Sequence, residues 1–378
     1  MSDAMNRNRI GITGPRGFIA GHLARQLAID PAYEVVLCPR SSFSDPQALE
    51  KFASGCDVIV HLAGLNAGSE QDVYDTNVGL VERLVAALSG SGSTPHVIFA
   101  SSTQRDRATG FGRSKKVGES RFREWAKQAN ARLTILEIPD VFGPGCRPYY
   151  GSMVATFCEQ LAHEQQPVLI GDQSLTLVWV NDLIEAIEQT ISDPRDGIQE
   201  ARIAGSAQIP ASELLNKLQA ISFGYFDENI VPNLADPIDA KLYTTFLSHV
   251  DLDDHRHQPQ LHSDARGQLF EVLRLTGGGQ FFFSTTRPGL IRGNHFHSRK
   301  VEWVCVVRGQ AVIRIRRVGD SRFREYRVSG DKPEFISIPA LHTHQIENVG
   351  ADDLMTMFWC NEIYRPSDPD TFQEKNAA

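Results

Sequence analysis

Short apolar runs alternate with helix-like patterns along the first half of the chain. The apolar runs are Arg9–Thr13, Glu34–Cys38, Asp57–Leu62, His96–Ala100 and Leu133–Ile138. Between them lie stretches such as Ile19–Leu27 and Val78–Leu88, in which apolar residues recur every three or four positions. Because buried strands that alternate with helices are typical of parallel sheets, we predict a doubly wound α/β fold with helices on both faces. Pro210–Ile221 predicts one further helix.

The pattern changes near residue 250. Asp251–Gln260 is polar and typical of a linker, so His255 and His257 within it are expected to be solvated. Short β-rich runs then follow without an amphipathic helix: Gln280–Ser284, Trp303–Val307, Ala311–Arg316, Glu334–Ile338 and Met355–Cys360. This pattern indicates an antiparallel barrel or jelly roll. We therefore predict two domains, residues 1–250 and 251–378.

The composition of the chain argues against several classes of function. The chain has 38 basic and 46 acidic residues, and a net charge of −8 disfavours nucleic acid and anionic membranes as partners. No apolar run reaches the ~18 residues of a membrane span, and the first residues lack the apolar core of a signal peptide. The six cysteines have no C-x-x-C spacing, which predicts reduced, mostly buried thiols in a cytoplasmic protein.

A glycine-rich turn joins the first predicted strand to the first predicted helix. Gly11, Gly14 and Gly17 leave room for a pyrophosphate at the helix N-terminus, although a purely structural turn would use the same residues. After the second strand, Arg40 stands where an acidic residue would bind the ribose hydroxyls of NAD. Arg40 can instead meet a 2′-phosphate, which favours NADP(H), or it is a solvated surface charge.

Further segments resemble the extended short-chain dehydrogenase/reductase family over residues 8–225. They are Asp57–Gly64, Asn77, Ala100–Thr103, Val141–Gly145 and Val178–Leu183. The resemblance implies a Rossmann-like domain. It also implies that NADP(H) is bound by Gly11, Gly14, Arg16, Gly17, Phe18, Ile19, Arg40, Leu62, Ala63, Gly64, Asn77 and Lys115.

The chain departs from this family at its catalytic motif. The family's Y-x-x-x-K motif aligns with Phe111–Lys115, so the lysine is present and the phenol is absent. A phenyl ring cannot transfer a proton. Either Phe111 is a substitution of the family tyrosine, or another group acts, or reduction is lost. Catalysis in this half is therefore assigned to Ser102, Thr103, Phe111 and Lys115, with Ser102, Thr103, Tyr149 and Tyr150 as substitute donors.

Two histidine motifs lie in the β-rich half. The first reads G-x5-H-x-H-x4-E-x6-G from Gly289 to Gly309, and the second reads P-x4-H-x3-N from Pro339 to Asn348. Strand alternation places His295 and His297 on one face, while Glu302 and His344 come from later strands. Three imidazoles and a carboxylate can bind a divalent metal, most simply Zn, whereas neutral hydrogen-bonded histidines are the alternative.

These motifs resemble the cupin family, with Leu341 where the second motif often has Gly. They imply a C-terminal all-β jelly-roll barrel, in which His342 faces either the same cavity or solvent. Arg287–His295 and Asp264–Glu271 also resemble the metal-free dTDP-sugar 3,5-epimerases. That second resemblance places Arg266 against a nucleotide phosphate and makes His295 a base, but beside the other three residues a ligand role is favoured.

Together the two halves resemble the bifunctional capsular polysaccharide enzymes of the UDP-N-acetyl-L-fucosamine pathway. The resemblance implies a UDP-linked 4-keto-6-deoxy amino sugar as substrate, C3 epimerisation in the cupin half, NADPH-dependent C4 reduction in the other, and a homodimer. The candidate substrate residues are Arg147, Tyr149, Tyr150, Arg266 and Arg292. The alternatives are an epimerase whose reductase half only holds NADP(H), and a non-catalytic sugar-nucleotide sensor.

Overall fold

The protein forms two compact units in a computed structural model. The structure describes residues 7–227, 230–258, 262–264, 267–269, 274–275, 279–362 and 366–374. The N-terminal unit comprises residues 1–142, 149–152 and 174–209, and the C-terminal unit comprises residues 143–148, 153–173 and 210–378. Residues 210–250 thus belong to the same compact unit as the β-rich half, and the sequence boundary at residue 250 stays a prediction.

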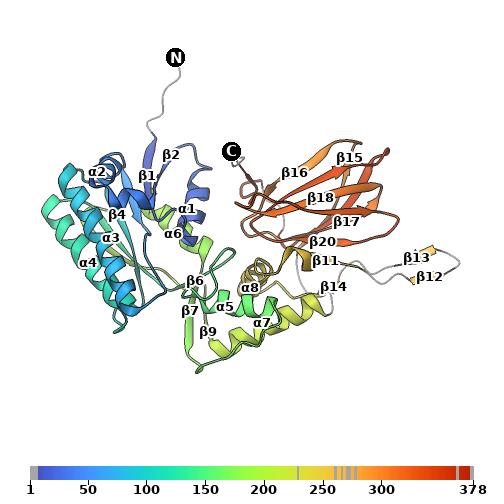
Figure 1. Ribbon diagram of the computed structural model, residues 1–378, viewed down its shortest axis with the longest axis horizontal. Coiled ribbons are helices and arrows are strands. Elements are labelled where there is room, and N and C mark those ends of the chain that lie inside the picture. Colours follow the sequence, from blue (N-terminus) through green and yellow to red (C-terminus); the bar gives the residue numbers. More distant parts are fainter. Residues whose placement is uncertain are drawn as a thin grey trace, which may run out of the picture. The chain divides into compact units, whose positions relative to one another are not determined.

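A six-stranded parallel sheet forms the centre of the N-terminal unit, as predicted (Figure 1). Its strands, in spatial order, are β2 (Tyr33–Cys38), β1 (Asn8–Thr13), β3 (Val58–His61), β4 (His96–Ser102), β5 (Leu133–Ile138) and β8 (Ile198–Arg202). The chain runs outward from β1 to β2 and then returns to β3 on the other side of β1. Open sheets with such a reversal bind ligands beyond the carboxyl ends of the strands, at the point where the strand order reverses.

Helices cover both faces of this sheet. One face packs on α2 (Pro46–Ser54), α3 (Glu70–Ser91) and α4 (Gly110–Ala129), and the other packs on α1 (Phe18–Leu27) and α6 (Val180–Ser192). Ile59 faces the first group, whereas Val58 and Val60 face the second, so alternate residues of one strand enter different cores. A 3₁₀ turn, η1 (Arg40–Ser44), follows β2, and a small sheet holds β6 (Asp140–Phe142), β7 (Ser174–Trp179) and β9 (Ala207–Pro210).

In its described residues, the C-terminal unit contains two five-stranded sheets and three α-helices. One sheet has the order β11 (Arg256–His257), β20 (Phe335–Ile338), β17 (Glu302–Arg308), β22 (Leu354–Cys360) and β15 (Gln280–Thr286). The other has the order β19 (Arg324–Ser329), β18 (Gln310–Arg317), β21 (His342–Asn348), β16 (Ile291–Phe296) and β23 (Phe372–Gln373). All pairings within these two sheets are antiparallel. The predicted antiparallel architecture is therefore confirmed.

The core of the C-terminal unit lies between its two sheets. Val304, Ile336 and Phe358 from the first sheet pack with Ile313 and Ile346 from the second. The helices are α5 (Met153–Ala162), α7 (Ala211–Phe226) and α8 (Pro237–Leu247). The short elements η2 (Leu252–His255), β10 (Ile230–Val231), β12 (His262–Asp264), β13 (Gly267–Leu269) and β14 (Arg274–Leu275) complete the described chain.

The expectation that His255 and His257 are solvated is wrong for His255, and His257 is half-buried, whereas most of the other described residues of 251–258 are exposed. His255 is fully buried, and its Nδ1 lies 2.6 Å from the Tyr225 hydroxyl and within hydrogen-bonding distance of Ser337 Oγ. His257 stacks on Trp303, with ring centroids 4.9 Å apart. Composition suggested solvation because the segment is polar, but the hydroxyls of Tyr225 in α7 and Ser337 in β20 lie within hydrogen-bonding distance of His255 Nδ1.

Two further observations bear on the sequence predictions. All six cysteines are buried free thiols, as expected. None of the helices in the described part of the chain is both long and apolar enough to cross a membrane.

Candidate functional site

The glycine turn stands at the carboxyl end of β1, next to the N-terminus of α1. Gly14 has a φ of +67°, and a Cβ there would lie 2.9 Å from the Cα of Ala63. Only glycine combines that conformation with that approach. Gly17 donates its backbone N–H to the Gly14 carbonyl at 2.8 Å and begins α1 without a side-chain cap. The first-turn amides of α1 are therefore available to an anion.

The loop after β3 is fixed beside this turn. Thr13 Oγ1 accepts the backbone N–H groups of Leu62 and Ala63, each at 3.0 Å. Asn77 in α3 accepts the Leu65 N–H at 2.6 Å and donates to the Leu65 carbonyl at 3.0 Å. A Cβ on Gly64 would lie 3.3 Å from the Asn77 amide oxygen. Asn77 is one of the residues predicted to bind the cofactor. In the structure its side chain holds the loop after β3 through these two hydrogen bonds.

Four other predicted cofactor residues lie at the same end of the sheet. Arg16 belongs to the glycine turn, and Phe18 and Ile19 open α1. Arg40 is exposed at the first position of η1, directly after β2. Because β2 pairs with β1 in parallel, Arg40 comes from the strand next to the glycine turn, on its carboxyl side. Its position is compatible with contact to the adenosine ribose of a dinucleotide.

Phe111 and Lys115 form a pair on the first turns of α4. They are four residues apart on the helix, so they share one face, and the Lys115 ammonium lies 5.4 Å from the centre of the Phe111 ring. Lys115 Nζ also donates to the Ala100 carbonyl in β4 at 2.8 Å. Burial lowers the pKa of Lys115 to about 8, and the nearby Glu119 carboxylate opposes that shift. The lysine of the motif is therefore in place and the ring beside it lacks a hydroxyl.

Ser102 and Thr103 lie at the carboxyl end of β4, two and three residues beyond Ala100. Ser102 is buried, and its Oγ accepts the backbone N–H of Gln104 at 3.1 Å. The Gln104 side chain donates to a carboxylate oxygen of Asp140 at 2.9 Å. Burial raises the pKa of Asp140 above its ordinary value. Sequence reasoning missed Asp140, since an acidic residue two positions after a buried strand carries no motif of its own.

The remaining substrate candidates are scattered over the described chain. Tyr150 accepts the Asn66 backbone N–H at 3.3 Å, and Tyr149 is exposed with a φ of +57°. Arg147 and Arg292 are exposed, Arg292 on β16. Arg266 lies outside the described residues.

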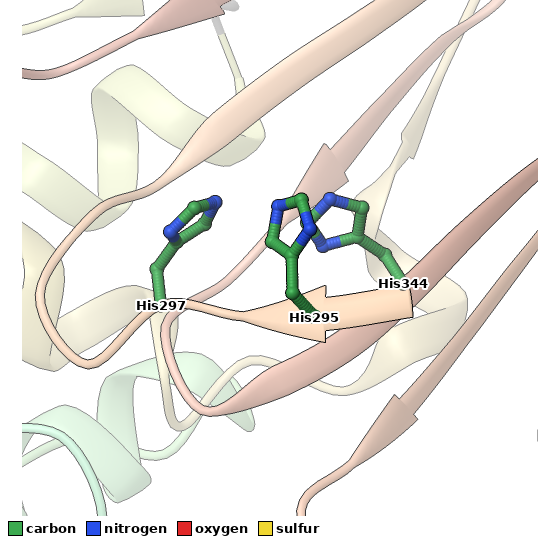
Figure 2. A group of neighbouring side chains, drawn as sticks. All are labelled: His295, His297 and His344. Carbon is green, nitrogen blue, oxygen red and sulfur yellow. The ribbon is translucent and has the colours of Figure 1, made fainter. Parts of the chain in front are cut away.

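Three histidines of the predicted metal set converge in the C-terminal unit (Figure 2). His295 is the next-to-last residue of β16, His297 directly follows that strand, and His344 lies opposite His295 on the paired strand β21. One nitrogen from each ring lies within 4.8 Å of the others. Glu302 from β17 reaches the same place, with its Oε2 3.6 Å from His297 Nε2 and 3.5 Å from His344 Nε2. The four predicted residues therefore meet.

Local backbone features set up this cluster. The pairing of β16 with β21 shifts register between Gly293 and His295, and Asn294 at this bulge has a φ of +60°. Gly293 has a φ of +92°, and a Cβ there would lie 2.7 Å from the His344 carbonyl oxygen. The bulge re-aims His295 at the cluster, and only glycine permits the close approach of the two strands. Leu341, at the position where cupins often have Gly, adopts a φ of +60°.

The charges in the cluster favour a cation. Burial would raise the pKa of Glu302, but the surrounding imidazoles outweigh it and lower the pKa to about 2. Burial lowers the pKa of His344 to about 3 and also lowers that of His295. Burial opposes protonation of His297, but Glu302 outweighs it and raises the pKa of that ring. A buried carboxylate beside His295 and His344, whose neutral forms burial favours, and beside His297 is a donor set for a divalent ion.

Backbone carbonyls orient two of the rings. His295 Nδ1 lies 3.1 Å from the Gly293 carbonyl and His297 Nδ1 lies 2.6 Å from the Asp370 carbonyl. Each carbonyl takes an Nδ1–H, so each Nε2 keeps a lone pair, and His297 Nε2 is buried without a hydrogen-bond partner. His342 is buried rather than solvated, and its Nδ1 lies 2.9 Å from the Ala340 carbonyl.

Comparisons with known proteins cover both halves of the chain. The profile of the NAD dependent epimerase/dehydratase family matches residues 10–204, and the profile of the polysaccharide biosynthesis C-terminal domain matches residues 262–372. A UDP-2-acetamido-2,6-beta-L-arabino-hexul-4-ose reductase from Pseudomonas aeruginosa is 30% identical over 368 residues, which is 96% of this chain and 98% of that protein.

Solved structures give the same picture. The capsular polysaccharide assembling protein CapF from Staphylococcus aureus matches with a TM-score of 0.61 and 30% identity, over 97% of this chain and 100% of that one. A UDP-glucose 4-epimerase from Thermotoga maritima, solved with UDP-glucose, matches with a TM-score of 0.53 and 18% identity, over 64% of this chain and 98% of that one. At that identity the second likeness bears on the fold alone.

Proposed function

The chain belongs to the NAD dependent epimerase/dehydratase family, and from that premise we propose that it is a bifunctional nucleotide-sugar enzyme of capsular polysaccharide synthesis. In this proposal the β-rich half is a cupin that inverts C3 of UDP-2-acetamido-2,6-dideoxy-β-L-arabino-hexos-4-ulose. The N-terminal unit then reduces the C4 ketone with NADPH, giving a UDP-N-acetyl-L-talosamine-type 6-deoxy sugar. The observation that carries the proposal is the similarity to the Pseudomonas reductase, because it runs through both units.

The residues of the N-terminal unit support a reductase. The glycine turn and the first-turn amides of α1 would hold the pyrophosphate of NADP(H), and Arg40 would hold its 2′-phosphate. Bound NADPH supplies a hydride to C4 of the sugar. Lys115 holds positive charge beside the oxygen that becomes an alkoxide, and Ser102 donates a hydrogen bond to that oxygen.

The proton for this oxygen needs another source than residue 111. Asp140 is a candidate, because its burial favours the protonated acid and its bond to Gln104 ties it to the strand end that carries Ser102. Ser102, Thr103, Tyr149 and Tyr150 are the other candidates. Two single variants, D140N and S102A, separate these assignments when their rates of NADPH oxidation are compared.

The residues of the C-terminal unit fit a divalent metal. The orphaned Nε2 of His297 and the shared approach of His297 and His344 to Glu302 are the observations that support the fit. His295, His297, Glu302 and His344 would hold the ion, for which Zn is the simplest choice. A bound ion would polarise a carbonyl oxygen of the sugar and so acidify the neighbouring C–H. The four side chains would hold the ion, and three of them, His297, Glu302 and His344, are buried.

One experiment tests both steps. The protein is incubated with NADPH and the 4-keto sugar in deuterated water, and deuterium at C3 and loss of NADPH absorbance are followed together. We expect deuterium at C3 and slow oxidation of NADPH. Deuterium without any oxidation favours the epimerase whose first half only holds NADP(H), and neither signal favours a sensor. Sedimentation of the same sample tests the expected homodimer.

A further inference from the structure

A buried carboxylate near the C-terminal end of the chain accepts an unusual number of hydrogen bonds. Asp370 is 3% exposed, and its Oδ1 accepts the backbone N–H of Ser298 at 3.0 Å and the Ser298 hydroxyl at 2.6 Å. Its Oδ2 accepts the backbone N–H groups of Arg299 and Lys300, each at 3.0 Å. The chain thus buries this carboxylate against the four-residue turn Ser298–Val301.

That turn connects two members of the metal set. Ser298, Arg299 and Lys300 lie between His297 and Glu302 in the chain, so their backbone decides where both side chains start. Lys300 Nζ donates to the Pro369 carbonyl at 2.8 Å, which adds a second tie between the turn and the segment that contains Asp370. A residue that holds this turn in place therefore positions two candidate ligands, His297 and Glu302, at once.

Asp370 also reaches His297 through its own backbone. Its carbonyl oxygen lies 2.6 Å from His297 Nδ1, opposite the nitrogen that faces Glu302. The residue has a φ of +42°, a conformation that side chains other than those of Gly, Asn and Asp rarely adopt. The hydrogen bonds of the carboxylate hold the backbone in this conformation, and the carbonyl then points at the ring.

We propose that Asp370 is a positioning residue for the metal site: it fixes the turn between His297 and Glu302 and sets which nitrogen of His297 is free. This inference rests on the proposed metal site. Asp370 is no ligand itself, since its carboxylate is fully used by the turn. Its role is to restrict the conformations of His297 and Glu302 before the ion binds. Without it, that conformational freedom would be lost only on binding.

The D370N substitution tests the charge with little change of shape. Asparagine tolerates a positive φ and keeps one oxygen for Ser298, but its NH₂ group then faces the N–H groups of Arg299 and Lys300. Outer-shell substitutions of this kind weaken metal binding by about 10- to 100-fold. We expect the dissociation constant for Zn²⁺, measured by competition with a chromophoric chelator, to rise by that factor.

Asp368 provides the matched control. It lies two residues away and is exposed, and it pairs with the Arg299 side chain rather than with the backbone of the turn. D368N removes the same charge from the same segment, so we expect its Zn²⁺ affinity to stay within about threefold of the original.

A second readout needs no metal. In metal-free protein we expect the backbone amides of Ser298, Arg299 and Lys300 to be protected from hydrogen exchange, because each donates to the buried carboxylate. D370N should keep protection at Ser298 and lose it at Arg299 and Lys300, with the amides of β18 unchanged as a measure of folding.

The two readouts keep this inference separate from the proposed function. Weaker Zn²⁺ binding together with faster exchange at Arg299 and Lys300 supports the positioning role. An unchanged Zn²⁺ affinity in D370N overturns it, whatever the exchange rates. If the unsubstituted protein binds no Zn²⁺ while its three amides are protected, the metal site itself is wrong and the inference falls with it.

Discussion

The Phe111 side chain differs from the phenol that the family resemblance leads us to expect by one oxygen atom. The ring is held on α4 with the Lys115 ammonium 5.4 Å from its centre, so the lysine of the motif lies beside the ring. Lys115 has a lowered pKa but donates to the Ala100 carbonyl, which directs it along β4. Its charge can stabilise an alkoxide, whereas delivery of the proton falls to another group.

We expect F111Y to raise the rate of NADPH oxidation with the 4-keto sugar by about 10²- to 10⁴-fold, the usual contribution of general acid catalysis. The hydroxyl would stand beside an ammonium that lowers its pKa. Deuterium entry at C3 should not change, because the metal set lies in the other unit. F111L is the control, since it alters packing without adding a donor. If F111Y is no faster than F111L, the defect lies elsewhere in the reductase site.

Arg40 should decide the choice of cofactor. We expect NADPH to bind at least about tenfold more tightly than NADH, a difference of roughly 1.4 kcal/mol. R40D should reverse the preference, because a carboxylate repels the 2′-phosphate and accepts bonds from ribose hydroxyls. Titration of intrinsic fluorescence with both nucleotides measures this. Equal dissociation constants in the unsubstituted protein would show that Arg40 is only a surface charge.

At residue scale, the sequence predicted the side chains that share a motif and missed those that do not. His295, His297, Glu302 and His344 follow a fixed spacing, and the fold brings them together. Asp370 is 68 residues beyond Glu302 in the chain, and its bonds depend on a tertiary approach that no local pattern records.

Single helices and strands were likewise predicted where the sequence has a regular pattern and missed where it has none. The strands and helices of the first half were predictable because their apolar periods, 2 and 3.6, are enforced by burial on both faces of one sheet. The burial of His255 was not, because residues 251–258 are polar and resemble a linker, whereas α7 and β20 supply the Tyr225 and Ser337 hydroxyls near its Nδ1. Polarity along the chain cannot distinguish a solvated group from a buried, hydrogen-bonded one.

The burial of His255 has a measurable consequence for the dependence of the protein's stability on pH. Burial lowers the pKa of His255 well below the ordinary value of 6.5, so the folded protein keeps this ring neutral while the unfolded chain protonates it. Stability is therefore fully present above pH 6.5 and falls as the pH decreases, by about 1.4 kcal/mol per pH unit for one such histidine. We expect H255Q to reduce the slope of the urea-unfolding free energy between pH 6 and pH 5 by about that amount.

His163 offers a control of opposite sign. The Glu159 carbonyl and carboxylate raise the pKa of this half-exposed ring, so its contribution is present at low pH and is lost as the pH rises through that pKa. H163Q should make the acid loss slightly steeper. A solvated His255 would instead leave the slope unchanged in H255Q.

At the scale of the whole molecule, the residues of the two proposed reactions belong to two compact units. Phe111 and Lys115 belong to the N-terminal unit, whereas all four residues of the metal set belong to the C-terminal unit. The proposed intermediate is a UDP-sugar, a charged and water-soluble molecule. No covalent link to the protein is needed between its formation and its reduction, so the two steps can be separated onto two chains.

We therefore expect two inactive variants to complement each other. H297A should lose bound metal and C3 deuteration, and K115M, placed in the F111Y background for signal, should lose NADPH oxidation. A mixture of H297A/F111Y with K115M/F111Y should again oxidise NADPH and release the reduced sugar, at a rate that rises with the concentration of each. Unmixed controls define the background. A mixture that deuterates C3 but never oxidises NADPH would mean that the intermediate cannot leave one chain for another, and that both steps require the same molecule.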